Sequence, residues 1–124
     1  RAASLRRPGR YQLQAAIAAA HAEERPWAEI VVLYDLLAEI DPSPIVLLNR
    51  AVAVALAGDL EAGLEQMESL EGLEGYHLLH AAQADLLRRL ERRDEAAAAY
   101  RRALELTANE SETRYLEQRL AEVS

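Results

Sequence analysis

Apolar residues recur at helical spacing along most of this chain, in segments separated by proline, glycine and acidic turn residues. The clearest segment is 95–106, in which the small Ala96 is followed four positions later by the bulky Tyr100. Residues four apart lie on the same face of a helix, so this spacing predicts a helix that buries one stripe. A small residue on that stripe lets a neighbouring helix approach closely, and a large one fills the space beside it.

The same pattern returns at intervals of 33 residues. Gly63 and Met67, then Ile30 and Tyr34, occupy the small and bulky positions of two earlier copies, although Ile30 is larger than the pattern predicts. The helix before each copy also has a small residue at one repeated position, and these residues are Ala18, Ala51 and Ala84. Repetition at this period predicts an all-α fold: a tetratricopeptide-like stack of three helical hairpins plus a C-terminal capping helix, about seven helices in total. A helix bundle without repeat geometry is the alternative.

Turn signals divide the chain into its predicted elements. Helices are expected at 11–24, 27–40, 44–57, 60–70, 76–89, 93–106 and 111–123. Residues 1–10, which are basic and contain Pro8-Gly9, are predicted to be a linker from a preceding region, and 11–124 the helical domain. Glu91 stands where the second copy has Gly58, so a mildly strained left-handed turn is expected there.

Composition narrows the classes of function. The chain has 124 residues, enough for one domain, and it contains no cysteine, which excludes disulfides and thiolate chemistry. Its net charge of −7 opposes non-specific binding of nucleic acid by this domain, although all 14 basic residues are arginine. No apolar run is long enough to span a membrane, so a cytoplasmic location is expected.

Residue patterns typical of catalysis are missing. There is no glycine-rich phosphate loop, no His-x-x-x-His pair and no Ser/His/Asp grouping that spacing supports. His77 and His80 lie three residues apart, but a metal site would need a third ligand, and Asp85 falls on another face. We therefore expect no enzymatic activity, no metal and no cofactor.

Polar residues within the first helix of each hairpin are the candidate site. In a stack of this kind, the first helices line the concave surface. The candidates are Gln12, Gln14, Asn49, Arg50, His80, Asp85 and Arg88. Arg50 takes a position where a large apolar residue is expected, so it should be paired if buried, and Asp85 is its predicted partner. Two interpretations stay open: an internal polar network that fixes the orientation of the hairpins, or direct recognition of a partner.

Four segments together resemble one family. They are Tyr11–His21, Pro44–Ala53, Gly75–His80 and Ala84–Leu90, of which Leu48-Asn-Arg-Ala-Val-Ala53 and Tyr76-His-Leu-Leu79 are the most specific. They resemble the C-terminal tetratricopeptide-like extension of bacterial extracytoplasmic-function (ECF) RNA polymerase sigma factors. The resemblance runs from Tyr11 to Leu120, and Glu91 departs from the glycine common in that family's turn.

The resemblance implies a regulatory role. The parent protein would direct RNA polymerase to promoters through upstream helical regions that bind promoter DNA. This domain would modulate transcription initiation by contacting the sigma core, the polymerase or a signalling protein, and would not read DNA itself. The alternative is a free-standing adaptor that binds a peptide in its concave groove.

Overall fold

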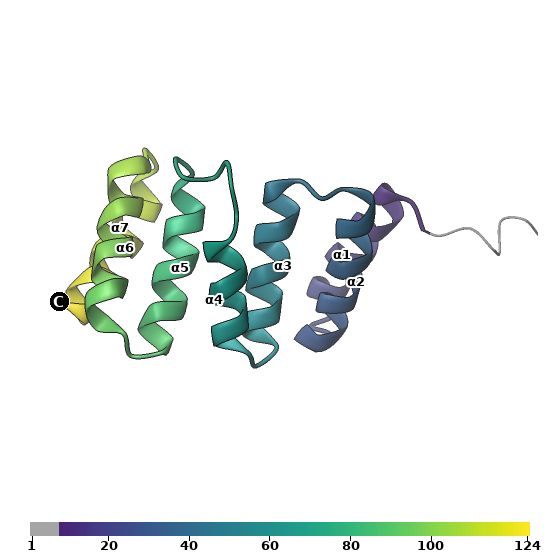
Figure 1. Cartoon of the computed structure of the whole chain (residues 1–124), viewed down its shortest axis with the longest axis horizontal. Helices are drawn as coiled ribbons and strands as arrows, with labels where there is room; N and C mark the ends of the chain where they lie inside the picture. Colours follow the sequence, from purple (N-terminus) through teal and green to yellow (C-terminus); the bar gives the residue numbers. More distant parts are fainter. Residues whose placement is uncertain (1–7) are drawn as a thin grey trace, which may run out of the picture.

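The protein is all-helical over residues 8–124, the part that the computed structural model describes (Figure 1). Seven helices lie in this range, and it contains no strand. They are α1 (Arg10–Ala22), α2 (Trp27–Ile40), α3 (Pro44–Leu56), α4 (Leu60–Glu68), α5 (His77–Arg89), α6 (Arg93–Leu106) and α7 (Glu110–Val123). The predicted fold class and number of helices are confirmed.

The helices form three hairpins stacked in chain order, α1/α2, α3/α4 and α5/α6, with α7 packed on the last (Figure 1). Each helix contacts the next along the chain, and α3 also contacts α5, the first helix of the following hairpin. The result is an elongated stack that extends in one direction, as expected of helical repeats. This arrangement favours repeat geometry over the alternative of a bundle.

Small residues allow close packing in the second and third hairpins. Ala51, Ala84 and Ala96 have no exposed surface, and Gly63 is buried where α4 meets α3. The bulky positions are filled as predicted, since Met67 and Tyr100 are 1% and 0% exposed. These positions join the helices around a single core that extends to Leu116 and Val123 of α7.

The first helix is one residue out of register with the gapless 33-residue repeat. Ala18, predicted to be the close-packing residue, is exposed, and Ile17 is buried in its place. The left-handed turn residue shows the reason. Glu24 precedes Gly58 by 34 residues, whereas Gly58 precedes Glu91 by 33, so the first turn is one residue longer. The first hairpin therefore has isoleucine, not a small residue, at both matching positions, Ile17 and Ile30.

Some helix bounds and some predicted buried residues were wrong. Helix α1 begins at Arg10, within the predicted linker, whose residues 1–7 lie outside the described part of the chain. Helix α4 ends at Glu68, two residues before Leu70. Helix α7 begins at Glu110, because the side chain of Asn109 accepts a hydrogen bond from the backbone N–H of Glu112 and caps it.

Helical spacing predicts that His21 and Tyr115 lie on the inner faces of their helices, but both side chains lie at the surface. His21 is exposed and meets the ring of Trp27 edge-on, with 5.3 Å between ring centroids. Tyr115 is 41% exposed. Leu48 and Ala53 of α3 are buried.

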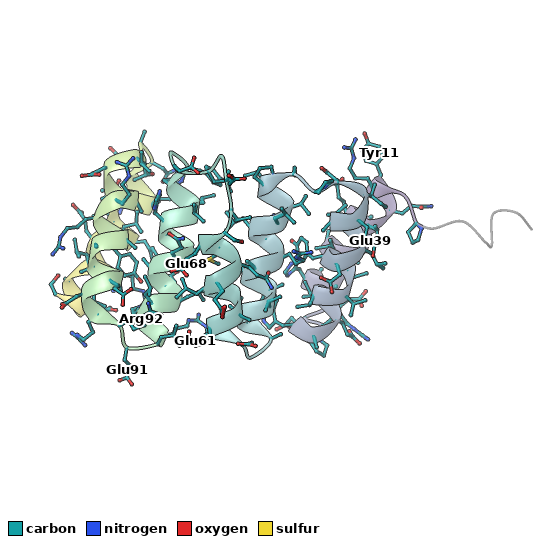
Figure 2. All side chains as sticks on the ribbon, viewed as in Figure 1. Tyr11, Glu39, Glu61, Glu68, Glu91 and Arg92 are labelled. Carbon is teal, nitrogen blue, oxygen red and sulfur yellow. The ribbon has the colours of Figure 1, made fainter. Side chains whose placement is uncertain are left out.

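The expected left-handed turn before α6 is confirmed. Glu91 has a φ of 62°, and Figure 2 shows its side chain pointing away from the stack at this turn. Glu24 has a φ of 54° in the first hairpin, and Gly58 a φ of 124° in the second. Left-handed backbone costs an L-residue about 1–2 kcal/mol that glycine avoids.

Substituting Glu91→Gly should therefore stabilise the domain. Part of the relief is offset by the greater flexibility of glycine in the unfolded chain, so we expect a net gain of about 1 kcal/mol. Urea unfolding followed by circular dichroism measures it. The reverse change at the equivalent turn, Gly58→Ala, should lower the free energy of unfolding. If both substitutions raised this free energy, or both lowered it, the explanation would be contradicted.

Candidate functional site

The first helices of the second and third hairpins, together with α7, enclose an open groove of about 510 Å³, here called the α3–α5–α7 groove. Its lining is mainly apolar, with a few polar side chains at intervals. The residues are Ile45, Leu48, Asn49, Val52, Tyr76, Leu78, Ala81, Ala82, Asp85, Ser111, Glu112, Tyr115 and Leu116. Helix α7 thus serves both as the cap of the stack and as one wall of the groove.

Large apolar side chains are exposed on this groove. Ile45 and Leu78 are each 42% exposed, and Tyr115 is 41% exposed. Together they make up half of the six large hydrophobic residues exposed in the described chain, and each comes from a different wall. Apolar side chains gathered around one hollow are typical of a surface that binds another molecule, whereas single exposed apolar residues are ordinary.

A polar network closes one wall of the groove and joins three helices. The hydroxyl of Tyr100 on α6 donates to Asp85 Oδ1 at 2.6 Å and accepts from Arg88 Nε at 3.1 Å. The hydroxyl of Tyr115 on α7 donates to both carboxylate oxygens of Asp85, at 3.1 Å each. Arg88 Nη2 lies 3.9 Å from Asp85 Oδ1, a long ion pair. Asp85 therefore fixes α5 against both of the helices that follow it.

Burial dominates the electrostatics of this network. Desolvation raises the pKa of the Tyr100 hydroxyl well above its usual range, and its hydrogen bond to Asp85 raises it further. Arg88 acts in the opposite direction on the same hydroxyl. Tyr100 is thus held as the neutral donor that the Asp85 carboxylate requires, and the tyrosine ring itself is fully buried in the core.

A second polar contact lies at the start of α5. His77 Nε2 is 2.6 Å from Glu112 Oε2, which links α5 to the first turn of α7. His80 Nε2 is 2.8 Å from the backbone carbonyl of Glu74 in the preceding loop. The two histidines thus have separate structural partners, and no cluster of three His, Asp or Glu side chains suited to a metal ion occurs within residues 8–124.

The predicted site residues fall into separate places. Asn49 and Asp85 line the groove. Arg88 does not line it, but donates a hydrogen bond to the hydroxyl of Tyr100 behind its wall. Gln12 accepts a hydrogen bond from the backbone N–H of Gly9 at 2.6 Å and so caps α1, while Gln14 is exposed on that helix and does not line the groove.

The predicted pair of Arg50 with Asp85 was wrong. Arg50 Nη1 lies 3.9 Å from Asp35 Oδ1 of α2, on the side of α3 that packs against the previous hairpin. Asp85 instead points toward α6 and α7, where the two tyrosine hydroxyls meet it. Both side chains are only partly buried, so neither required the other as a charge partner.

That α7 lines the groove was not predicted from the sequence, although the 33-residue interval implies it. Continuing the 33-residue interval through the last helix aligns Asn49 with Ala82 and Tyr115, and all three line the groove. The same interval aligns Ile45 with Leu78, which also line it. Treating the cap as the first helix of a further hairpin would have placed Tyr115 on the concave surface.

None of the described helices is long and apolar enough to cross a membrane. No family model matches the chain. An uncharacterized protein of Rhizobium meliloti (strain 1021) is 48% identical over 121 residues, which cover 93% of this chain but 29% of that relative. The chain thus spans less than a third of the length of the protein it matches.

Proposed function

We propose that this domain is the protein-interaction tail of an ECF-type sigma factor. It modulates promoter-directed transcription initiation by contacting the sigma core, RNA polymerase or a signalling protein, and it works in the cytoplasm. The α3–α5–α7 groove is the observation that carries this proposal, because an open apolar groove on a rigid stack is suited to holding a protein segment.

Other observations agree with a role inside a longer regulator. The resemblance of four segments to sigma-factor extensions supplies the transcriptional setting. The matched relative is much longer than this chain, which leaves room in that protein for other regions. The charge of −7 makes promoter DNA a poor partner for this domain, so DNA contacts fall to the rest of the parent protein.

Catalysis forms no part of the proposal. The groups at the groove that could transfer protons are engaged in holding helices together: Asp85 by two tyrosine hydroxyls and Glu112 by His77. A free-standing adaptor is the second candidate, since the same groove would serve it without any link to transcription. The two candidates differ in whether the domain alters transcription by its parent protein.

Leu78→Glu should impair regulation if the groove is the interface. The substitution places a charge on the exposed apolar wall of the groove that Asp85 and Glu112 also line, without opening a cavity in the core. The measurement is run-off transcription by the parent sigma factor with purified core polymerase, with and without the candidate regulator. The amount of transcript should change by about tenfold, the effect of losing roughly 1.4 kcal/mol of binding free energy.

Ile40→Glu is the matched control, because Ile40 is 45% exposed on α2 and does not line the groove. Both variants should retain their helical circular dichroism. Unchanged transcription by Leu78→Glu, or an equal effect of Ile40→Glu, would argue against the groove as the regulatory surface. Binding of a peptide in the groove with no effect on transcription would favour the free-standing adaptor.

A further inference from the structure

The charged side chains that line the α3–α5–α7 groove are both acidic. Asp85 and Glu112 line it, and no arginine among residues 8–124, the described part of the chain, does so. Two arginines lie beside its wall without lining it: Arg88 is directed to the hydroxyl of Tyr100, and the guanidinium of Arg119 lies over the ring of Tyr115, 5.3 Å from its centroid. Complementary charge is what guides a protein segment to its site and excludes wrong partners, so the occupant of this groove should be basic.

Asp85 is the better of the two acids for receiving a cation. Glu112 is already in contact with His77 at 2.6 Å. Asp85 is held by neutral hydroxyl donors, and its nearest guanidinium, that of Arg88, is 3.9 Å away. The tyrosines orient the carboxylate without neutralising it, and the exposed side chain of Tyr115 is the one that must move aside to admit a cation.

The groove favours a helix over an extended segment. Its walls are three helices whose backbone groups are already hydrogen-bonded, and its polar side chains are few. An extended segment would leave much of its own backbone unpaired there, whereas a helix satisfies its backbone internally. Leu78 and Asp85 lie seven residues apart on α5, which is about 10 Å along the same face.

From these three observations we infer that the groove binds an amphipathic helix that lies along α5 between α3 and α7. The helix places an apolar side chain over Leu78 and Ile45, and an arginine or lysine about two turns away against Asp85. The inference rests on the proposed function only in taking the groove as a protein interface. It adds the chemistry of the partner, which is basic and helical.

Selection from a phage-displayed library of helical peptides tests this directly, using the intact domain as bait. Selected peptides should combine apolar residues spaced three and four apart with a basic residue about seven positions from one of them. A representative peptide should bind the Asp85→Asn variant about tenfold more weakly, as expected when one charge pair is lost. Asp94→Asn makes the same change of net charge at an exposed residue outside the groove and should bind like the unmodified domain.

The outcomes separate the two proposals. Peptides that lack a basic preference but are lost on Leu78→Glu would overturn the assignment to Asp85 and leave the groove as an interface. Peptides that bind Leu78→Glu as well as the unmodified domain would overturn both. Selection of acidic peptides, or of no peptide at all, would contradict a basic helical partner.

Discussion

Gly63→Leu is expected to lower the free energy of unfolding by more than about 3 kcal/mol, at the upper end of the cost of overpacking a core. A Cβ atom added at Gly63 would lie 2.6 Å from the Cβ of Ala55 and 2.7 Å from the carbonyl oxygen of Ala51. The second of these atoms belongs to the backbone of α3, so it cannot rotate away. Accommodating a leucine would separate α3 from α4 in the middle of the stack.

Gly63→Ala tests the same contact more gently. Alanine favours a helix over glycine by about 1 kcal/mol, so without a clash this substitution would stabilise α4. We expect the clash to prevail and the domain to lose about 1–2 kcal/mol. Gly75→Ala is the control, since nothing lies within 4 Å of the added atom, and that variant should be neutral or slightly more stable. Chemical denaturation of all three variants decides the matter, and a stabilised Gly63→Ala would refute the close approach.

The features predictable from sequence were those set by short-range chemistry. Pro26 and Pro44 mark where α2 and α3 begin, and Gly58 ends the helix before it, because each restricts or frees its own backbone. The 33-residue repeat then fixed which residues in the second and third hairpins are small and buried. Gly63 is the clearest case, because glycine destabilises a helix and is expected within one only where a neighbouring helix packs closely against it.

The register of α1 could not be predicted from the 33-residue repeat. The chain from 15 to 22 is almost entirely alanine, so shifting this helix by one residue exchanges one alanine for another at most positions. The information lies in the turn, where Glu24 rather than Arg25 takes the left-handed conformation. Within the helix, the register is marked only by Leu13 and Ile17, which lie four residues apart and are both buried.

Polar pairing across helices was the other limit. The repeat aligns Asp85 with Val52, two positions after Arg50, so the side chains of Arg50 and Asp85 project from nearly opposite faces of their helices. Arg50 points back toward α2 and Asp85 forward toward α6 and α7. Tyr100 was predicted as a core residue from its size, whereas the partner of its hydroxyl depends on how α5 and α6 face each other.

Tyr100→Phe should lower the free energy of unfolding by about 2 kcal/mol, because hydrogen bonds to charged groups contribute about 1.5–3 kcal/mol. The substitution keeps the buried ring and removes a hydroxyl that donates to Asp85 at 2.6 Å and accepts from Arg88 at 3.1 Å. Tyr115→Phe is the comparison, since its hydroxyl is at the surface and its contacts are longer, 3.1 Å. It should cost about 0.5 kcal/mol, at the low end for a hydrogen bond.

Combining Tyr100→Phe with Asp85→Asn tests whether the two residues act together. If they form one network, the loss of stability in the double variant will be smaller than the sum of the single losses by at least about 0.5 kcal/mol. Additive losses would mean that the hydroxyl and the carboxylate contribute independently, and that Asp85 is held mainly by other groups.

The pH dependence of stability gives an independent measure of the same hydroxyl. Because the pKa of Tyr100 is raised in the folded protein, mainly by burial, its contribution is fully present below the unfolded value of about 10. The contribution is then lost as the pH rises above that value toward the folded pKa. The free energy of unfolding should therefore fall more steeply above pH of about 10 in the unmodified domain than in Tyr100→Phe. Tyr34, whose pKa is also raised by burial, is present in both proteins, so the difference between the two curves isolates Tyr100. Parallel curves would show that this hydroxyl is not the buried donor to Asp85.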